Sequence, residues 1–340
     1  MHDEKKVIHI MNPLRLQIIK RLQTSEEPSI RYTTALFYDQ ADPSSLKMRE
    51  LQEEIRDSPR AQLLLKNIVP KRVYSKWQGA FWVLSILAEL NYPLNDDSLE
   101  PLLHQVYDWF FSPQFIKKIR TIKGKVRRCA SQEGNAIYFS KKLGIADERT
   151  DRLVDRLLEF QWPDGGWNCD KNPEAHCSSY HESLIPLRAL IKYLNDAGNK
   201  LTQSRKNEIQ IAIEKAKEVF LKRELFLLRS TGNPIHWKGK ESFTLLHFPY
   251  YWRYNILFAL KVLNEGGSLG DPRCQNALSL IESKELPSGG FPAETKYYIY
   301  SSQNNRSGRS AVNWGGVRKR NFNEWVTSEI FSILKDANRL

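Results

Sequence analysis

The chain has 340 residues, of which 41% are hydrophobic and 26% are charged. This profile is typical of a folded protein with a sizeable core and excludes a disordered or collagen-like chain. The 51 basic and 39 acidic side chains give a net charge of +12, which favours an anionic partner such as a phosphate, an acidic glycan or an anionic membrane surface.

No long apolar segment of the kind found in signal peptides or spanning helices occurs near the start, so we expect a soluble, cytoplasmic protein. The four cysteines have no regular spacing, and in a reducing compartment we expect them to be free thiols or metal ligands. Nothing in the sequence specifies an oligomeric state.

Apolar residues recur at three- and four-residue spacing along most of the chain, which predicts an almost entirely α-helical protein. Asn12 and Pro13 are typical of a helix start, and a first helix is expected over residues 14–22, with its apolar side chains on one face. We assign residues 1–27 to an N-terminal helical extension and residues 28–340 to the main domain.

From residue 28 onward the chain repeats one pattern, in which an apolar helix, a short polar turn and a more charged amphipathic helix follow one another. The apolar helices are expected over 32–37, 78–90, 132–143, 181–190, 254–263 and 325–334, each containing a leucine near its end. Charged partners are expected, for example, over 46–55 and 206–220, with enlarged loops at 229–247 and 292–323. Such units bury their apolar faces against their neighbours, so we predict six helical hairpins in two concentric layers, with an open superhelix as the alternative.

Residues 155–167 read Asp-Arg-Leu-Leu-Glu-Phe-Gln-Trp-Pro-Asp-Gly-Gly-Trp. Glycines after a helix permit a tight reversal, the aromatic ring can pack across the turn, and the glutamine can bind exposed backbone groups. The segment resembles the glutamine–tryptophan repeat of squalene–hopene cyclases and the Gly-Gly-Phe turn of protein prenyltransferase β subunits. A weaker copy stands at 280–292, and 313–316 is a degenerate candidate. This resemblance implies the all-α, α/α toroid fold of the terpenoid cyclase and prenyltransferase superfamily over residues 28–340.

The resemblance also implies an enzyme, a transferase or isomerase, that acts on an isoprenoid or other apolar substrate in a central aromatic-lined cavity. The Asp-x-Asp-Asp and Asp-Asp-x-x-Asp motifs of terpene cyclases and synthases do not occur in this sequence. Prenyltransferase β subunits bind zinc through an Asp-x-Cys segment and a later histidine. His181 falls where that histidine would lie, but no Asp-x-Cys segment precedes an apolar helix here.

Polar residues stand at the predicted starts of the apolar helices. Glu133 is a candidate general acid or base with Arg128 as an anion-binding neighbour, and a helix-capping network is the alternative interpretation. His181 and Tyr254 are the other catalytic candidates, although a helix-start histidine is most often a locally satisfied polar residue. Because equivalent helix starts open at the same end of a ring, we expect these three candidates and Trp325 to converge on one cavity.

Aromatic residues gather at the same helix starts, and residues 247–255 alone contain five aromatic rings besides a histidine. Such rings can stack on a sugar, stabilise a carbocation or form ordinary core. The candidate substrate-binding residues are Trp77, Trp82, Arg128, Trp167, His247, Tyr250, Tyr251, Arg253 and Trp325.

Cysteine and histidine are donors that zinc prefers, and they are concentrated between residues 167 and 182. If zinc is a cofactor, the candidate ligands are Cys129, Cys169, His181 and His247; cavity or packing roles are the alternative. The seven cations between residues 117 and 128 fit a phosphate, peripheral contact with an anionic membrane, or a solvated rim. Nucleic acid is not expected, because no binding motif or interleaved aromatic residues accompany them.

Three functions are therefore compatible with the sequence. The first is an enzyme of the cyclase and prenyltransferase class. The second is a carbohydrate-active toroid, such as a lyase or hydrolase for an anionic glycan. The third is a non-catalytic toroid that binds a partner or a small apolar or anionic ligand. A dry apolar tunnel would favour the first, an open groove with paired carboxylates the second, and an interior filled by side chains the third.

Overall fold

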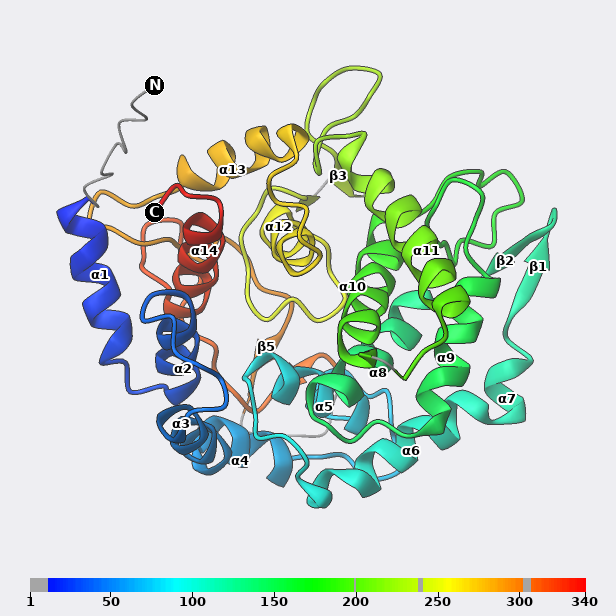
Figure 1. Cartoon of the computed structure of the whole chain (residues 1–340), viewed down its shortest axis with the longest axis horizontal. Helices are drawn as coiled ribbons and strands as arrows, with labels where there is room; N and C mark the ends of the chain where they lie inside the picture. Colours follow the sequence, from blue (N-terminus) through cyan, green and yellow to red (C-terminus); the bar gives the residue numbers. More distant parts are fainter. Residues whose placement is uncertain (1–11, 199, 238–240, 302–306) are drawn as a thin grey trace.

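Helices dominate the computed structural model, which describes residues 12–198, 200–237, 241–301 and 307–340 (Figure 1). Helix accounts for 52% of the chain and strand for 5%, so the prediction of a mostly α-helical protein is confirmed. The first 11 residues of the predicted N-terminal extension, and parts of both predicted loops, lie outside the described residues.

The six apolar helices expected from the repeat are all present. They are α2 (Pro28–Phe37), α5 (Ala80–Glu89), α8 (Ala130–Lys142), α10 (Tyr180–Ala197), α12 (Ile256–Glu265) and α14 (Glu324–Asp336). The last five begin within two residues of the predicted starts. The other described helices are α1 (Pro13–Gln23), α3 (Leu46–Asp57), α4 (Pro59–Lys66), α6 (Glu100–Phe111), α7 (Pro113–Ile116), α9 (Glu148–Glu159), α11 (Gln203–Leu221) and α13 (Gln275–Glu282).

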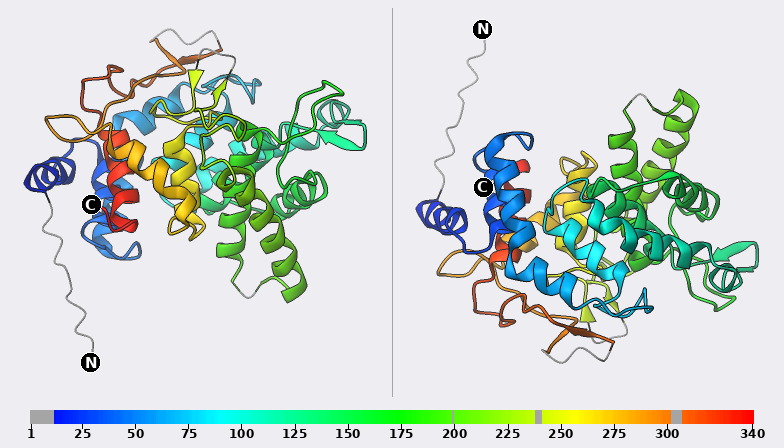
Figure 2. Two further views of the ribbon diagram at one scale, coloured as in Figure 1. Left: turned by 90° about the horizontal axis from the view of Figure 1, so that it is seen from above. Right: turned by 90° about the horizontal axis from the view of Figure 1, so that it is seen from below.

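The apolar helices contact one another in the order α5, α8, α10, α12, α14, α2, and α2 is linked to α5 through α3 and α4. Figure 1 shows these helices around the middle of the molecule, with α1, α3, α6, α9, α11 and α13 farther out. Sequence explains the difference: α5 is apolar on every side and buried on every side, whereas α9 buries one stripe and exposes its charged face. The longest pair, α10 and α11, projects from the rest in both views of Figure 2.

Among the residues that the structure describes, six short strands form three pairs that the sequence pattern did not predict. β1 (Arg120–Ile122) and β2 (Lys125–Arg127) are antiparallel and joined by Lys123 and Gly124, both with positive φ, as in a type I′ hairpin. The other pairs, β3 (His236–Trp237) with β4 (Glu241–Ser242) and β5 (Ile299–Tyr300) with β6 (Arg309–Ser310), lie in the two long loops. Strands of two or three residues are too short to produce a recognisable alternation.

The glycine turns after α9 and α13, at residues 162–166 and 286–290, have the same hydrogen bonds. In each turn the first residue's N–H donates to the carbonyl oxygen of the fifth, at 2.8 Å in both. The fourth residue's N–H donates back to the carbonyl of the first, at 2.9 and 2.8 Å. The fourth residues, Gly165 and Gly289, have φ of 102° and 82°, which residues with a Cβ rarely adopt. The weaker sequence copy is therefore structurally equivalent to the stronger one.

The aromatic residue that follows each turn is fixed to the next apolar helix. The N–H of Trp167 donates to Ser183 Oγ, and the N–H of Phe291 donates to Thr327 Oγ1, both at 2.9 Å. Each hydroxyl donates back to the carbonyl of the same aromatic residue, at 3.2 Å. Ser183 and Thr327 are the fourth residues of α10 and α14, so each turn joins the end of a charged helix to the start of an apolar one.

A buried arginine links four of the apolar helices. Arg188 of α10, which is 2% exposed, donates to both carboxylate oxygens of Glu265 on α12, at 2.7 and 2.8 Å. It also forms an ion pair with Glu89 of α5 and donates to the Tyr138 hydroxyl of α8 at 2.5 Å. A cation inside an apolar layer is stable only when such partners replace the lost water.

Lys261 of α12 extends this cluster to α14. Its ammonium donates to Glu89 at 3.1 Å and to Glu329 of α14 at 2.6 Å. Burial acts to raise the pKa of Glu89, but the charges of Arg188 and Lys261 outweigh it and lower that pKa to about 2. We call Arg188, Lys261, Glu89, Glu265 and Glu329 the central ion cluster.

Candidate functional site: a pocket at the start of α8

A pocket of about 360 Å³ lies where β2 runs into α8. One wall is aromatic and consists of Tyr74, Trp109 of α6 and Phe115 of α7. The Tyr74 and Trp109 rings are stacked with centroids 5.3 Å apart, and Phe115 packs on Trp109 at 4.5 Å. The rings therefore support one another and present a preformed apolar surface.

The pocket is also lined by positively charged side chains, those of Lys118, Arg127, Arg128 and Lys171. Arg127 is 3% exposed, and its guanidinium lies 4.5 Å from the centroid of the Trp162 ring. Its Nη2 donates to a backbone carbonyl, whereas Nε and Nη1 have no hydrogen-bond partner among the described residues. No described carboxylate forms an ion pair with Arg127, so its charge is uncompensated.

Glu133, the candidate acid or base, is fully buried between two arginines. Its carboxylate accepts two hydrogen bonds from Arg128, at 2.8 and 2.5 Å, and one from Arg156 at 3.4 Å. The Arg128 guanidinium also lies 4.3 Å from the centroid of the Phe115 ring. In this arrangement Glu133 is a counter-ion that orients Arg128. It does not cap the helix, because the N-cap position of α8 is Cys129.

Two of the predicted zinc ligands, Cys129 and Cys169, lie together in the pocket wall. Glu182 of α10 joins them, and one donor atom from each of the three residues lies within 4.8 Å of the others. The thiol of Cys169 donates to Glu182 Oε1 at 3.4 Å, and the N–H of Ser131 donates to Oε2 at 3.0 Å. Hydrogen bonding with Cys129, burial and the charge of Glu182 raise the pKa of Cys169; burial raises that of Glu182.

The other two predicted ligands, His181 and His247, are not part of this donor group. His181 Nδ1 accepts the backbone N–H of Tyr254 at 2.9 Å, and burial together with the charge of Arg253 lowers the pKa of His181 to about 4. Arg253 itself lies over the Tyr297 ring, 3.8 Å from its centroid. The helix that carries His181 turns its imidazole toward α12, away from the thiols, which explains why the predicted set is not assembled.

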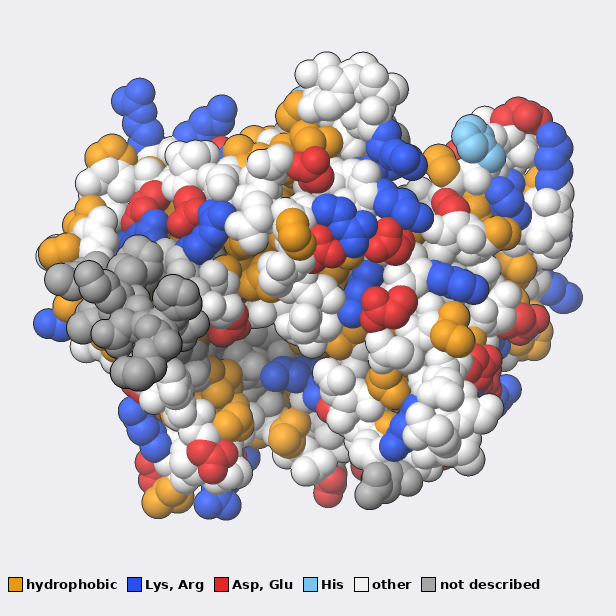
Figure 3. Space-filling view, turned by 45° about the horizontal axis from the view of Figure 1, so that its top comes forward, with side chains coloured by type: hydrophobic (Ala, Val, Ile, Leu, Met, Phe, Trp, Pro, Cys, Tyr) orange, Lys and Arg blue, Asp and Glu red, His pale blue; other side chains and the backbone are white. Residues whose placement is uncertain are grey.

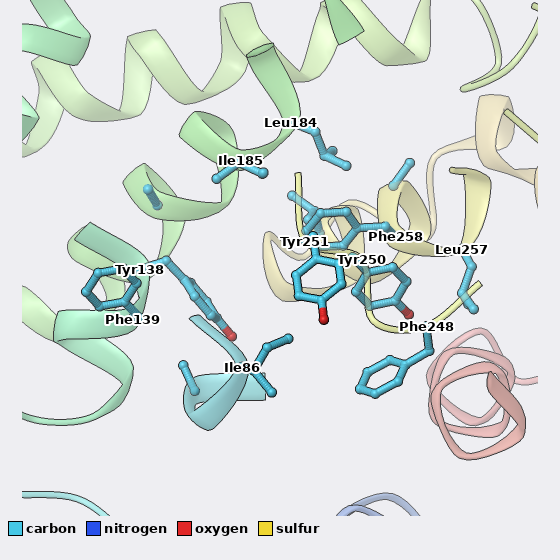
Figure 4. Close-up of a cluster of buried hydrophobic side chains, with 14 of the residues drawn as sticks. Ile86, Tyr138, Phe139, Leu184, Ile185, Phe248, Tyr250, Tyr251, Leu257 and Phe258 are labelled. Carbon is cyan, nitrogen blue, oxygen red and sulfur yellow. The ribbon is translucent and has the colours of Figure 1, made fainter. Parts of the chain in front are cut away.

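Aromatic side chains of the predicted substrate wall pack on one another. Tyr251 stacks on Trp77 with centroids 3.7 Å apart, and Trp82 meets both rings edge-on. Tyr250 stacks on Phe258 at 4.4 Å. Figure 4 shows Tyr250 and Tyr251 among side chains of α5, α8, α10 and α12. These rings are buried and serve as core in this structure.

Trp325, Trp167 and His247 are likewise held in packed surroundings. Trp325 stacks on Phe248 at 4.7 Å, and Trp167 donates its ring N–H to the carbonyl of Leu157 at 2.9 Å. His247 lies 2.9 Å from the Asn255 amide nitrogen. Of the four residues expected to converge, His181 contacts Tyr254, whereas Glu133 pairs with Arg128 and Trp325 stacks on Phe248.

Sequence reasoning missed Glu182, the pocket rings Trp109 and Phe115, and the central ion cluster. A usable signal existed for the cluster, because Arg188 and Lys261 stand among apolar residues of their helices and such a charge requires a buried partner. The missed residues Glu182, Trp109 and Phe115 carry no comparable signal, since they come from segments far apart in the chain.

Charged side chains are mixed on the face of the molecule shown in Figure 3. On the face shown in Figure 3, basic and acidic side chains are interspersed and do not form one large basic area. None of the described helices combines the length and apolar character needed to cross a membrane.

Comparison with protein-family models, curated protein sequences and solved structures finds no match to this chain.

Proposed function

We propose that residues 28–340 form an α/α toroid of the terpenoid cyclase and prenyltransferase class. Three observations support this proposal: the consecutive contacts of the six apolar helices, the link from α2 to α5 through α3 and α4, and the equivalent glycine turns after α9 and α13. The turns are the segments that carry the sequence resemblance, and their hydrogen bonds give that resemblance a structural basis.

The ligand that we propose is an amphipathic anion, such as an isoprenoid diphosphate, bound in the pocket at the start of α8. The observation that carries this proposal is the pairing of a stacked aromatic wall with four cations, one of them the buried and uncompensated Arg127. Aromatic rings bind an isoprenoid chain, and arginines bind a diphosphate through charge-assisted hydrogen bonds. A pocket of about 360 Å³ is within the size range of small-molecule sites.

This location differs from the central cavity expected from the sequence. The buried rings of the expected cavity support placing the site elsewhere, because Trp77 stacks on Tyr251 and Tyr250 stacks on Phe258. A glycan hydrolase is disfavoured, since that chemistry needs two carboxyl groups and none of the pocket-lining residues is acidic. The site thus fits a ligand-binding toroid, whose catalytic capacity depends on the chemistry available at Cys129 and Cys169.

Calorimetric titration with farnesyl diphosphate, inorganic diphosphate and farnesol tests the proposal. Farnesyl diphosphate should bind most tightly, and its affinity should fall as ionic strength rises because the cations contribute. Exposed Lys118→Met and Lys171→Met should each weaken binding by about two- to five-fold, the size expected of a solvent-exposed ion pair. Lys47→Met, an exposed position outside the pocket lining, is the matched control. Equal affinity for farnesol and its diphosphate, or unchanged affinity in a variant that combines Lys118→Met with Lys171→Met, would contradict the proposal.

A further inference from the structure

Cys129, Cys169 and Glu182 reach one point from three segments of the chain. Cys129 ends the connection from β2 to α8, Cys169 follows the glycine turn after α9, and Glu182 is in the first turn of α10. The backbone ties these segments together, since the N–H of Arg128 donates to the carbonyl of Asn168 at 3.0 Å. The fold therefore holds the backbone segments that carry the two cysteines side by side.

Glu182 gives an independent indication that a cation belongs here. It is 8% exposed, yet no described lysine, arginine or histidine forms an ion pair with it. Its hydrogen bonds come from the backbone N–H and the side chain of Ser131 and from the Cys169 thiol. A buried carboxylate without a counter-ion is costly, and a bound cation would supply the missing charge.

Two sulfur donors and one carboxylate oxygen select the kind of metal. Calcium and magnesium require oxygen ligands, whereas thiolates favour zinc and similar soft ions. Tetrahedral zinc with bonds of about 2.0 to 2.3 Å holds its donors about 3.3 to 3.8 Å apart. The separation of 3.4 Å between Cys169 Sγ and Glu182 Oε1 fits this spacing, and the other pairs lie within 4.8 Å.

We propose that Cys129, Cys169 and Glu182 bind one zinc ion, with the fourth coordination position facing the pocket that both cysteines line. This set differs from the Asp-x-Cys and histidine donors implied by the sequence resemblance. Three protein ligands and an open position are typical of zinc sites that act on a bound molecule. The zinc proposal does not depend on the identity of the ligand proposed above, although the zinc ion and that ligand would share one wall of the pocket.

Metal analysis of the full chain, purified under reducing conditions without chelator, tests the site directly. We expect about one equivalent of zinc, falling below about 0.1 equivalent in Cys129→Ser, Cys169→Ser and Glu182→Gln. Cys177→Ser, at an exposed cysteine outside the donor group, should keep the wild-type content. Circular dichroism of each variant shows whether a loss of zinc accompanies a loss of fold.

Cobalt substitution of the wild-type chain provides a test that needs no variant. Two thiolate ligands should produce intense sulfur-to-cobalt charge-transfer absorption and the visible bands of tetrahedral cobalt. Absence of this spectrum, together with less than about 0.1 equivalent of zinc after incubation with zinc and a reductant, would overturn the proposal. A Cys129–Cys169 disulfide that persists under reductant, seen as the loss of two hydrogens by mass spectrometry, would also overturn it. Neither result would affect the calorimetric test of the anionic ligand.

Discussion

Replacing Arg188 by methionine should destabilise the protein by about 3 to 5 kcal/mol, because it leaves Glu89 and Glu265 without their shared cation. Arg188 and Lys261 together lower the pKa of Glu89 from 4.5 to about 2, which corresponds to roughly 3 kcal/mol in favour of its charged form. Stability of 5 to 15 kcal/mol is typical of folded proteins, so the loss of about 3 kcal/mol would be a large fraction of the total.

Urea unfolding of the wild type and the variant, followed by circular dichroism, measures the loss. A cycle with Glu89→Gln should give a coupling free energy of at least about 2 kcal/mol between the two residues, since they are in direct contact. Arg205→Met is the control, because Arg205 pairs with exposed acids and should cost less than about 1 kcal/mol. A loss at Arg188 no larger than that at Arg205 would refute the reasoning that the central ion cluster joins the apolar helices.

Two further predictions concern pH and packing. Burial lowers the pKa of His247 to about 3, so the unfolded chain binds a proton first as pH falls below 6.5 and stability is lost. When the pH is lowered from 7 to 5, the free energy of unfolding should therefore fall by about 2 kcal/mol less in His247→Gln than in the wild type, as measured by urea unfolding. An equal fall in both proteins would exclude a buried neutral imidazole. Gly134→Ala would place a Cβ 2.8 Å from the Pro186 nitrogen and should cost about 1 to 3 kcal/mol in the same assay. Gly270→Ala, with open space around the added methyl, should change stability by less than about 0.5 kcal/mol, and a similar effect at both glycines would contradict close packing of α8 on α10.

Helix positions were predictable because long apolar periodicity is a local property of the chain. The exact residues at which helices begin and end were less predictable, since they depend on which side chains cap the helix. Asn255 accepts the N–H of Phe258 at 2.8 Å and starts α12 two residues later than expected from the aromatic pattern. The strands were not predictable, because β1 and β2 contain three residues each and gain their partners only when the chain reverses at Lys123 and Gly124.

The candidate site was predictable only in part. Arg128 and Cys129 were identified because polar residues precede a predicted helix, and Cys169 because cysteine and histidine are concentrated between residues 167 and 182. The aromatic wall was not, since Trp109 and Phe115 lie on α6 and α7 and read as ordinary amphipathic residues. Their contribution exists only because α6 and α7 fold back beside the start of α8.

The sequence by itself determined the helical class, the repeated pairing of apolar and charged helices, and the glycine turns, because each depends on residues close together in the chain. Tertiary structure alone decided which side chains meet. His181 and Glu182 are adjacent, yet one residue along a helix rotates a side chain by about 100°. The packing of α10 on α8 and α12 fixes that rotation, so Glu182 faces the two thiols and His181 faces Tyr254.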